Sequence, residues 1–353
     1  NNRGLGLSPT DILKNFILGH AAKLSDEKLE IVRDLWTKLI VTLDGINTDD
    51  FFRQYISSLL TRKVTKNKLT GAFKNRYFKK VNAVDELGEY RYSYGTLDND
   101  EDDDLDEYDE EESENSDEEI SRVNLDVFLQ KIVSAAETYS KIINREFGDK
   151  KVNQKLKELQ DIKCFPSYIF LMHYLREDHA RNEVLETLDL IGTLMLRRHV
   201  TGKSTARNDD IFSNLLRVDI ENRKPDVIRE NLMEWNPTDN EFKYSLPNHN
   251  FKQRVKNRAR YMLAEFEYHI TGNTNELSVN SPEDVHIEHI IPKKIHTKKS
   301  KRKYGDWESY LGDEAIQIHK TKKHRIGNLT LLAQDLNIVA SNNPFVKKKE
   351  SYE

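Results

Sequence analysis

The chain has 353 residues, of which 37% are hydrophobic and 33% are charged, so it is polar but long enough for two or three domains with their own cores. It has no apolar run of 18 residues, which argues against a membrane-spanning helix. Cys164 is the only cysteine, which excludes internal disulfides and cysteine-based zinc sites and favours a cytoplasmic protein.

The net charge of −5 hides a segregation of charge along the chain. Residues 98–119 contain 16 acidic side chains and no basic one; without them the 60 acidic residues fall to 44, against 55 basic ones. The remainder is therefore basic, as a nucleic-acid partner requires. We expect 98–119 to be a disordered insertion, because like charges repel and little there can be buried. The alternative is that it mimics DNA and restrains the basic part.

Apolar residues spaced three to four apart predict a helical first half. Helices are expected over 8–23, 26–43, 48–60, 68–80 and 121–147. Ser8 should cap the first of them, ahead of Pro9 and Asp11, which suit a first turn.

The same spacing continues into the second half of the chain. It predicts two helices between 166 and 200, broken near Asp178, and others over 209–217, 225–234 and 250–270. Residues 25–275 should thus form a helical middle domain. The helix over 250–270 is a candidate for nucleic-acid contacts through five basic residues: Lys252, Arg254, Lys256, Arg258 and Arg260.

The most informative stretch is Val285-His286-Ile287-Glu288-His289-Ile290-Ile291-Pro292. Its β-branched residues predict a strand that ends at the proline. A strand of this kind rarely holds Glu beside His unless the pair has chemistry to perform. In a regular strand Glu288 and His289 point to opposite faces, and His286 shares the face of Glu288. Glu288 and His289 come together only if the strand twists into the loop at His289.

Two further segments follow this strand. Residues 327–332 predict a turn into a second apolar strand, and residues 335–340 predict the start of a helix. A strand, a loop, a second strand and a helix, with Glu-His on the first strand and Asn on the helix, are typical of a one-metal phosphodiesterase site.

This pattern resembles the HNH (His-Me finger, ββα-metal) nucleases, and more narrowly the C-terminal nuclease of the GmrSD-like restriction endonucleases. The resemblance rests on Glu-His-Ile-x-Pro, Gly-Asn-Leu-Thr-Leu-Leu and the following Asn, Ser-Asn, Phe and Lys, in the last fifth of the chain. It implies a mainly α protein in which a small ββα-metal (HNH) nuclease domain, residues 276–353, follows the helical middle domain.

The resemblance also implies roles for individual residues. His289 is the general base, Glu288 and Asn337 bind one divalent ion, and Asn328 ties the loop and orients the base. His286 is an auxiliary ligand or a structural residue. Oxygen donors at the metal suit Mg²⁺ or Mn²⁺ better than zinc.

Basic residues around the motif are predicted to contact a phosphate backbone. They are Lys293, Lys294, Lys298, Lys299, Arg302, Lys347 and Lys348. The expected function is a metal-dependent DNA endonuclease of a restriction-type phage-defence system, and modified phage DNA is one form its substrate could take. The alternatives are an RNA nuclease and a non-catalytic DNA-binding or regulatory module with a decayed nuclease fold. The oligomeric state is left open.

A second resemblance lies at the start of the chain. Asn2-Arg3-Gly4, Leu7-Ser8, Asp11 and Lys14-Asn15 are similar to the tail of the ParB-like nucleotidase domain that precedes such nucleases. We therefore expect residues 1–24 to be that tail. The nucleotide-binding motifs would lie upstream, in a larger defence enzyme.

Overall fold

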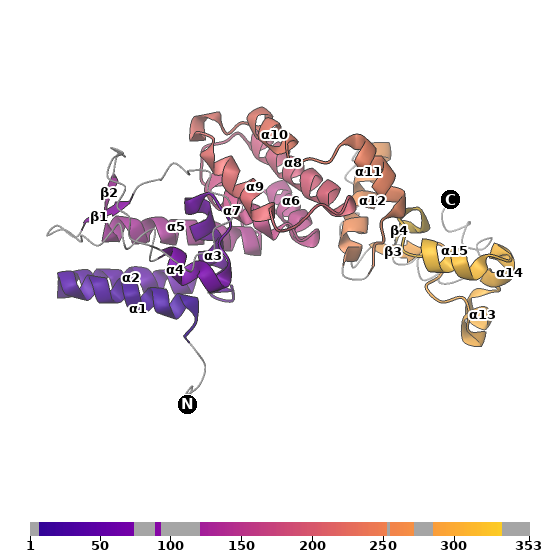
Figure 1. Cartoon of the computed structure of the whole chain (residues 1–353), viewed down its shortest axis with the longest axis horizontal. Coiled ribbons are helices and arrows are strands. Elements are labelled where there is room, and N and C mark those ends of the chain that lie inside the picture. Colours follow the sequence, from indigo (N-terminus) through magenta and orange to yellow (C-terminus); the bar gives the residue numbers. More distant parts are fainter. Residues whose placement is uncertain (1–6, 74–88, 93–120, 253–254, 272–284, 334–353) are drawn as a thin grey trace, which may run out of the picture. The chain divides into compact units, whose positions relative to one another are not determined.

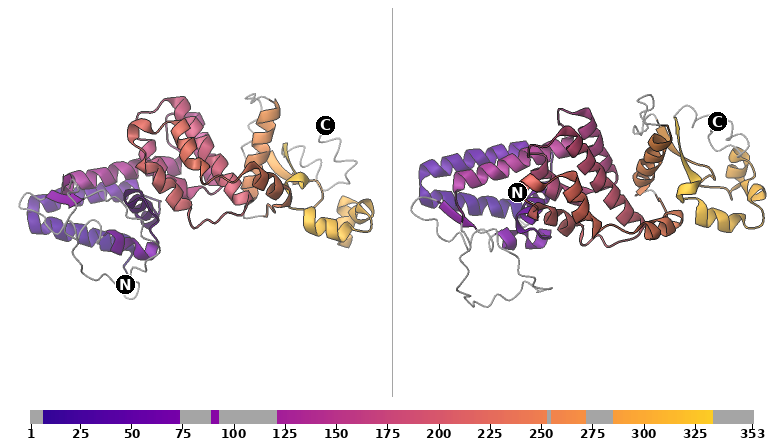
Figure 2. Two further views of the ribbon diagram at one scale, coloured as in Figure 1. Left: turned by 45° about the horizontal axis from the view of Figure 1, so that its top comes forward. Right: turned by 90° about the horizontal axis from the view of Figure 1, so that it is seen from above.

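A computed structural model describes residues 7–73, 89–92, 121–252, 255–271 and 285–333, and this part of the chain is mainly helical (Figure 1). The chain divides into two compact units. Unit 1 takes residues 1–153, 166–184 and 206–228, and unit 2 takes 154–165, 185–205 and 229–353. Figure 2 shows the helices and strands of each unit from two further sides. No helix in the described ranges combines the length and apolar character needed to cross a membrane.

Unit 1 is built mainly from packed helices, several of which coincide with the predicted amphipathic segments. Its helices are α1 (Pro9–Leu24), α2 (Asp26–Thr42), α3 (Thr48–Leu60), α4 (Leu69–Phe73), α5 (Leu125–Asn144), α7 (Tyr168–Tyr174) and α9 (Asn208–Asn214). Ser8 caps α1 in a capping box with Asp11. The core of the unit is aromatic: the Phe51 ring meets the Tyr139 ring edge-on at 5.3 Å, and Tyr139 meets Tyr168 at 5.8 Å.

A two-stranded antiparallel ladder precedes α5. It joins β1 (Glu89–Tyr92) to β2 (Ser121–Asn124), with Glu89 opposite Asn124. The prediction of a helix from residue 121 is therefore wrong for its first four residues, whose backbone hydrogen bonds go to β1 instead of along the chain. The acidic segment 98–119 and residues 74–80 of the expected helix 68–80 lie outside the described residues.

Unit 2 begins with packed helices and ends in a small hairpin. It holds most of α6 (Lys150–Asp161), α8 (Arg181–Val200) and α10 (Pro225–Met233), together with α11 (Asp239–Ser245) and α12 (Lys256–Thr271). The break near Asp178 occurs between α7 and α8, as predicted, whereas α6 and α11 were not predicted. A Cβ at Gly192 on α8 would lie 3.2 Å from the Tyr261 hydroxyl of α12, so this glycine permits the close approach of the two helices.

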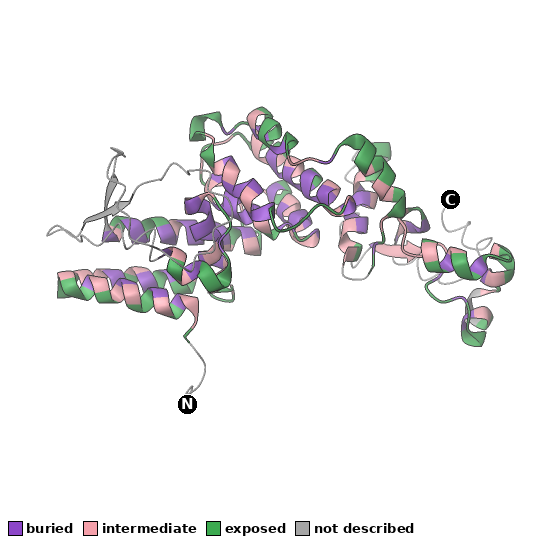
Figure 3. Cartoon of the chain, in the orientation of Figure 1, coloured by how far each residue is buried: buried purple, intermediate pink, exposed green. Residues whose placement is uncertain are grey.

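The hairpin pairs β3 (Val285–His289) with β4 (Leu329–Ala333) antiparallel. Between the strands lie three short helices, α13 (Lys298–Tyr304), α14 (Trp307–Leu311) and α15 (Ala315–Lys322). The hairpin packs on α12, where Ala264 and Val285 form a small core with Tyr268 and Leu331. Most residues of these short helices are exposed or half-buried (Figure 3).

Candidate active site in the C-terminal region

Strand β3 carries three of the predicted site residues, His286, Glu288 and His289. The ladder stays regular to its end, where His289 lies opposite Leu329 and the Ile290 amide donates to the Asn328 carbonyl at 3.0 Å. The strand therefore does not twist away before His289. By the alternation of a regular strand, Glu288 and His289 project to opposite faces.

His289 lines a pocket of about 580 Å³. Its wall holds three histidines, four basic residues and three apolar ones: His286, His289, His324, Lys252, Lys256, Arg260, Lys293, Phe251, Ile287 and Leu329. The rings of His289 and His324 are nearly perpendicular, with centroids 5.7 Å apart. None of the described lining residues is acidic, and Glu288 is not among them. The described charged side chains that line the pocket with the His289 imidazole are thus all basic.

The electrostatics of this pocket disfavour further positive charge. Burial lowers the pKa of His324, and the nearby cations Lys323, Lys293 and Lys252 lower it further. The His324 imidazole is therefore held neutral to lower pH than an ordinary histidine. An anion in the pocket would relieve the same repulsion.

Asn328 holds the loop that follows β3. Its side chain is buried, with 4% of the residue exposed. The Oδ1 atom accepts from the Ile291 amide at 2.8 Å, and Nδ2 donates to the carbonyls of Ile291 and Lys323, each at 3.1 Å. One neutral amide therefore fixes the chain two residues after His289 and also the segment after α15.

Comparison with known families bears on this region. The sequence of residues 236–353 matches the family model described as GmrSD restriction endonucleases, C-terminal domain. This part of the chain is similar to that C-terminal domain. No curated protein matches the chain, and no solved structure does. The family consists of restriction endonucleases, so the match indicates a nuclease domain and implies DNA as its substrate.

The GmrSD match begins at residue 236, ahead of the boundary predicted at residue 276. It therefore includes α11, α12 and the hairpin. Two hydrogen bonds link parts of this segment: the Phe251 amide, in the loop before α12, donates to the His324 carbonyl at 2.8 Å, and the Arg260 side chain of α12 donates through Nη1 to the Val285 carbonyl of β3 at 2.6 Å. Helix α12 therefore lies within the matched segment and is hydrogen-bonded to β3.

These contacts correct the prediction of a basic face over 250–270. Arg260 is only 8% exposed, and its guanidinium binds the start of β3. Arg258 is half-buried and donates through Nε to the Ile162 carbonyl at 3.0 Å. Both arginines serve packing, because a guanidinium can pair with buried carbonyls while its stem lies along apolar surface. Lys252 and Lys256 are exposed and line the pocket, and Arg254 lies outside the described residues.

Two histidines between β3 and β4 have structural contacts. His319 is 5% exposed, and its Nε2 donates to the Pro292 carbonyl at 2.9 Å. His296 Nδ1 donates to Glu308 at 2.6 Å, and Glu308 also pairs with Lys301. No spacing in the sequence pointed to these contacts, because both join residues through the tertiary fold.

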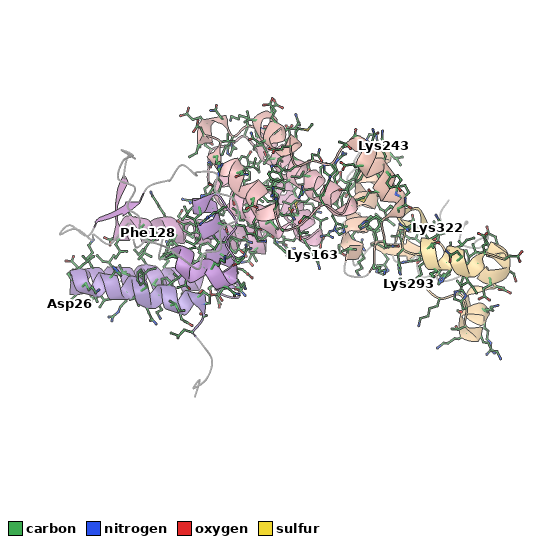
Figure 4. All side chains as sticks on the ribbon, in the orientation of Figure 1. Asp26, Phe128, Lys163, Lys243, Lys293 and Lys322 are labelled. Carbon is green, nitrogen blue, oxygen red and sulfur yellow. The ribbon has the colours of Figure 1, made fainter. Side chains whose placement is uncertain are left out.

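The other predicted site residues are dispersed or lie beyond the described chain. Lys293 and Lys294 are exposed in the loop after β3, and Figure 4 labels Lys293. Lys298, Lys299 and Arg302 are exposed on α13. Asn337, Lys347 and Lys348 fall outside the described residues. Within the described ranges, no three or more His, Cys, Asp or Glu side chains gather where they could hold a metal ion.

Proposed function

We propose that this GmrSD domain is a divalent-metal-dependent DNA endonuclease with a ββα-metal (HNH) fold, acting in a cytoplasmic restriction-type phage-defence system. The observation that carries the proposal is the placement of His289 in a pocket whose described charged wall is entirely basic. A phosphodiester is an anion, so this wall attracts it and holds it beside the imidazole.

His289 acts as the general base. A neutral imidazole accepts a proton from the attacking water, which is the usual role of histidine as a general base. Asn328 acts as a positioning residue, since its amide holds the Ile291 backbone just beyond His289. Lys252, Lys256 and Lys293 neutralise the phosphate charge from the pocket wall.

The proposal includes one Mg²⁺ or Mn²⁺ ion. A carboxylate from Glu288 and an amide oxygen from Asn337 are the hard oxygen donors that these ions prefer. In the regular ladder Glu288 projects to the face opposite His289, so the proposal requires the end of β3 to turn before both groups can act on one phosphate. When bound, such an ion stabilises charge on the phosphate and on the leaving oxygen. His286 remains the proposed auxiliary group, because it lines the pocket on the same strand.

The N-terminal assignment also remains a proposal. Residues 1–24 are proposed as the tail of a ParB-like nucleotidase domain. Helix α1 packs within unit 1, where the Thr10 hydroxyl donates to Asp49 at 2.6 Å. Such a tail would therefore be anchored on the helical region.

The test is cleavage of supercoiled plasmid by the full chain with Mg²⁺, with Mn²⁺ and with EDTA. We expect metal-dependent nicking or cutting, and a loss of about 10²- to 10⁴-fold in rate for His289→Ala, the usual contribution of a positioned base. The matched control is His269→Ala, which removes an exposed histidine of α12 that does not line the pocket.

Other outcomes separate the alternatives. DNA binding without cleavage, unchanged by Glu288→Ala, would identify a decayed nuclease that serves as a binding module. Cleavage of an RNA of the same sequence in preference to DNA would identify an RNA nuclease. Cleavage that survives His289→Ala would refute the assignment of the base.

A further inference from the structure

A second hollow of about 520 Å³ lies between the loop after β3 and helix α15. Four lysines line it, Lys293, Lys294, Lys320 and Lys323, and we name it the lysine groove. Two of its lining residues are histidines, and none of those described is acidic. Lys293 also lines the pocket of His289, so the two hollows share one side chain of their walls.

Buried polar groups hold the backbone of the groove on both sides. On one side His319 donates to the carbonyl of Pro292, the residue before Lys293. On the other side Asn328 donates to the carbonyl of Lys323. Asn328 also binds Ile291, so a single buried side chain sets the position of the groove relative to the loop after His289.

Asp306 and Glu308, which lie between the two sides of the groove in the sequence, have partners of their own. Glu308 binds His296 and Lys301, and Asp306 caps α14 through the Ser309 amide at 3.2 Å. Neither carboxylate is part of the groove wall. The groove therefore gathers several positive charges whose mutual repulsion an anionic ligand would relieve.

We propose that the lysine groove binds the phosphate backbone of duplex DNA next to the phosphate held at His289, and that Lys293 joins groove and pocket into one backbone track. The identity of the nucleic acid rests on the proposed function. A polymer of phosphates fits better than one small anion, because the basic wall extends from one hollow into the next. Lysine suits this task, since it contacts phosphate as a mobile point charge without reading bases.

The proposal singles out lysines in and directly after α15 that the motif itself does not include. Lys320 and Lys323 line the groove, whereas the equally basic Lys298 and Lys299 on α13 line neither hollow. The two pairs lie in the same segment and carry the same charge. They therefore form a matched comparison between a built groove and diffuse positive charge.

The experiment measures binding of the full chain to a fluorescent DNA duplex of two helical turns, about 20 base pairs. Anisotropy is recorded in EDTA, which prevents metal-dependent cleavage, over a series of salt concentrations. The variants are K320Q/K323Q and K298Q/K299Q, which keep side-chain length and remove charge. For K320Q/K323Q we expect about 10- to 100-fold weaker binding near 0.1 M salt and a slope of log K against log salt that is lower by roughly 2, from two lost phosphate contacts.

For K298Q/K299Q we expect a clearly smaller change in both quantities. Unchanged binding by K320Q/K323Q would overturn the proposal, and equal losses in both pairs would also overturn it, because they would indicate diffuse charge. Tighter, groove-dependent binding of duplex RNA would overturn the choice of DNA. A chain that binds DNA through the groove but never cleaves it would refute the nuclease function alone. Circular dichroism of each variant checks its folding.

Discussion

The pocket of His173 in unit 1 and the pocket of His289 in unit 2 differ in how their charges are arranged. The pocket of unit 1, about 460 Å³, has His173 with both signs of charge, and its Arg223 pairs with its own Glu177. His173 Nε2 lies 2.8 Å from the Ser58 hydroxyl. The pocket of His289 in unit 2 has lysines and no acidic residue among its described lining.

The difference shows that a histidine in a hollow does not by itself identify an active site. In unit 1 the wall contains the carboxylate of Glu177 beside Arg176 and Arg223, and burial, with these two arginines, lowers the pKa of His173 to about 4. That imidazole stays neutral and structural. In unit 2 none of the described residues that line the pocket is acidic, so its wall is suited to an external anion. The two pockets therefore differ in whether an acidic side chain is present in the wall.

The largest effect is expected on DNA binding, when one charge is reversed in each of the two pockets. Lys256→Glu places a carboxylate in the wall that should hold phosphate, and like-charge repulsion of this kind should weaken DNA binding by roughly 10²-fold. Arg176→Glu makes the same change in the pocket of unit 1 and should leave DNA binding within about twofold. Both are measured by anisotropy at fixed salt. Equal losses would mean that the two pockets do not differ in function.

Removing the amide that organises the pocket of unit 2 should have the next largest effect. Asn328→Ala leaves the Ile291 amide and two carbonyls without their partner, which should lower the free energy of unfolding by about 2–4 kcal/mol. Cleavage should fall by at least about tenfold even well below the melting temperature, because the loop beyond His289 loses its anchor. Asn248→Ala, which removes a bond to the Tyr244 carbonyl at an exposed site, is the control. Full activity of folded Asn328→Ala would exclude a positioning role.

The histidine of unit 1 should reveal itself through the pH dependence of stability. Its folded pKa is lowered to about 4 from 6.5, so between these pH values the unfolded chain binds a proton that the folded chain does not. The stabilisation is therefore present above pH 6.5 and is lost as the pH falls to about 4, by roughly 1–3 kcal/mol. His173→Gln should remove this part of the acid sensitivity.

Urea unfolding at pH 7 and at pH 4.5 measures the effect of His173→Gln. Trp36, buried in unit 1, reports the transition when Trp235 and Trp307 are replaced by Phe in both proteins. Other titrating groups are common to both and cancel in the difference. Parallel losses of stability in variant and parent would contradict the assignment of the neutral imidazole.

The smallest effect is expected at the edge of the lysine groove. Glu308→Gln removes a carboxylate that is paired with His296 and Lys301. Exposed ion pairs contribute little to stability, and the loss of one negative charge should tighten DNA binding by no more than about threefold. Glu186→Gln, which breaks the exposed pair with Arg229, is the control and should not change binding. Weaker DNA binding by Glu308→Gln would show that the carboxylate takes part in the groove.

The pattern of residue types along the chain was sufficient to predict many of the helices and strands. The helices that became α1, α2 and α3 were predicted to within a few residues, because their apolar spacing, caps and first-turn acids all agree. The first strand of the hairpin follows from its β-branched residues and from Pro292 after it, and the second follows from its apolar residues and from Gly327 before it. In contrast α6, with few apolar residues, and β2, whose hydrogen bonds depend on a distant strand, were missed.

The linear order of residues was enough to find the Glu-His strand, the Asn after the turn and the GmrSD family, because such motifs require fixed residue types at short spacing. Only the tertiary structure showed that Arg260 supports β3 and that Lys293 stands between two basic hollows. It also brought Lys320 and Lys323 beside the loop after His289. These contacts join residues that are far apart in the chain. Their energies depend on burial and on distances between charges in the folded protein, and residue spacing along the sequence does not give either quantity.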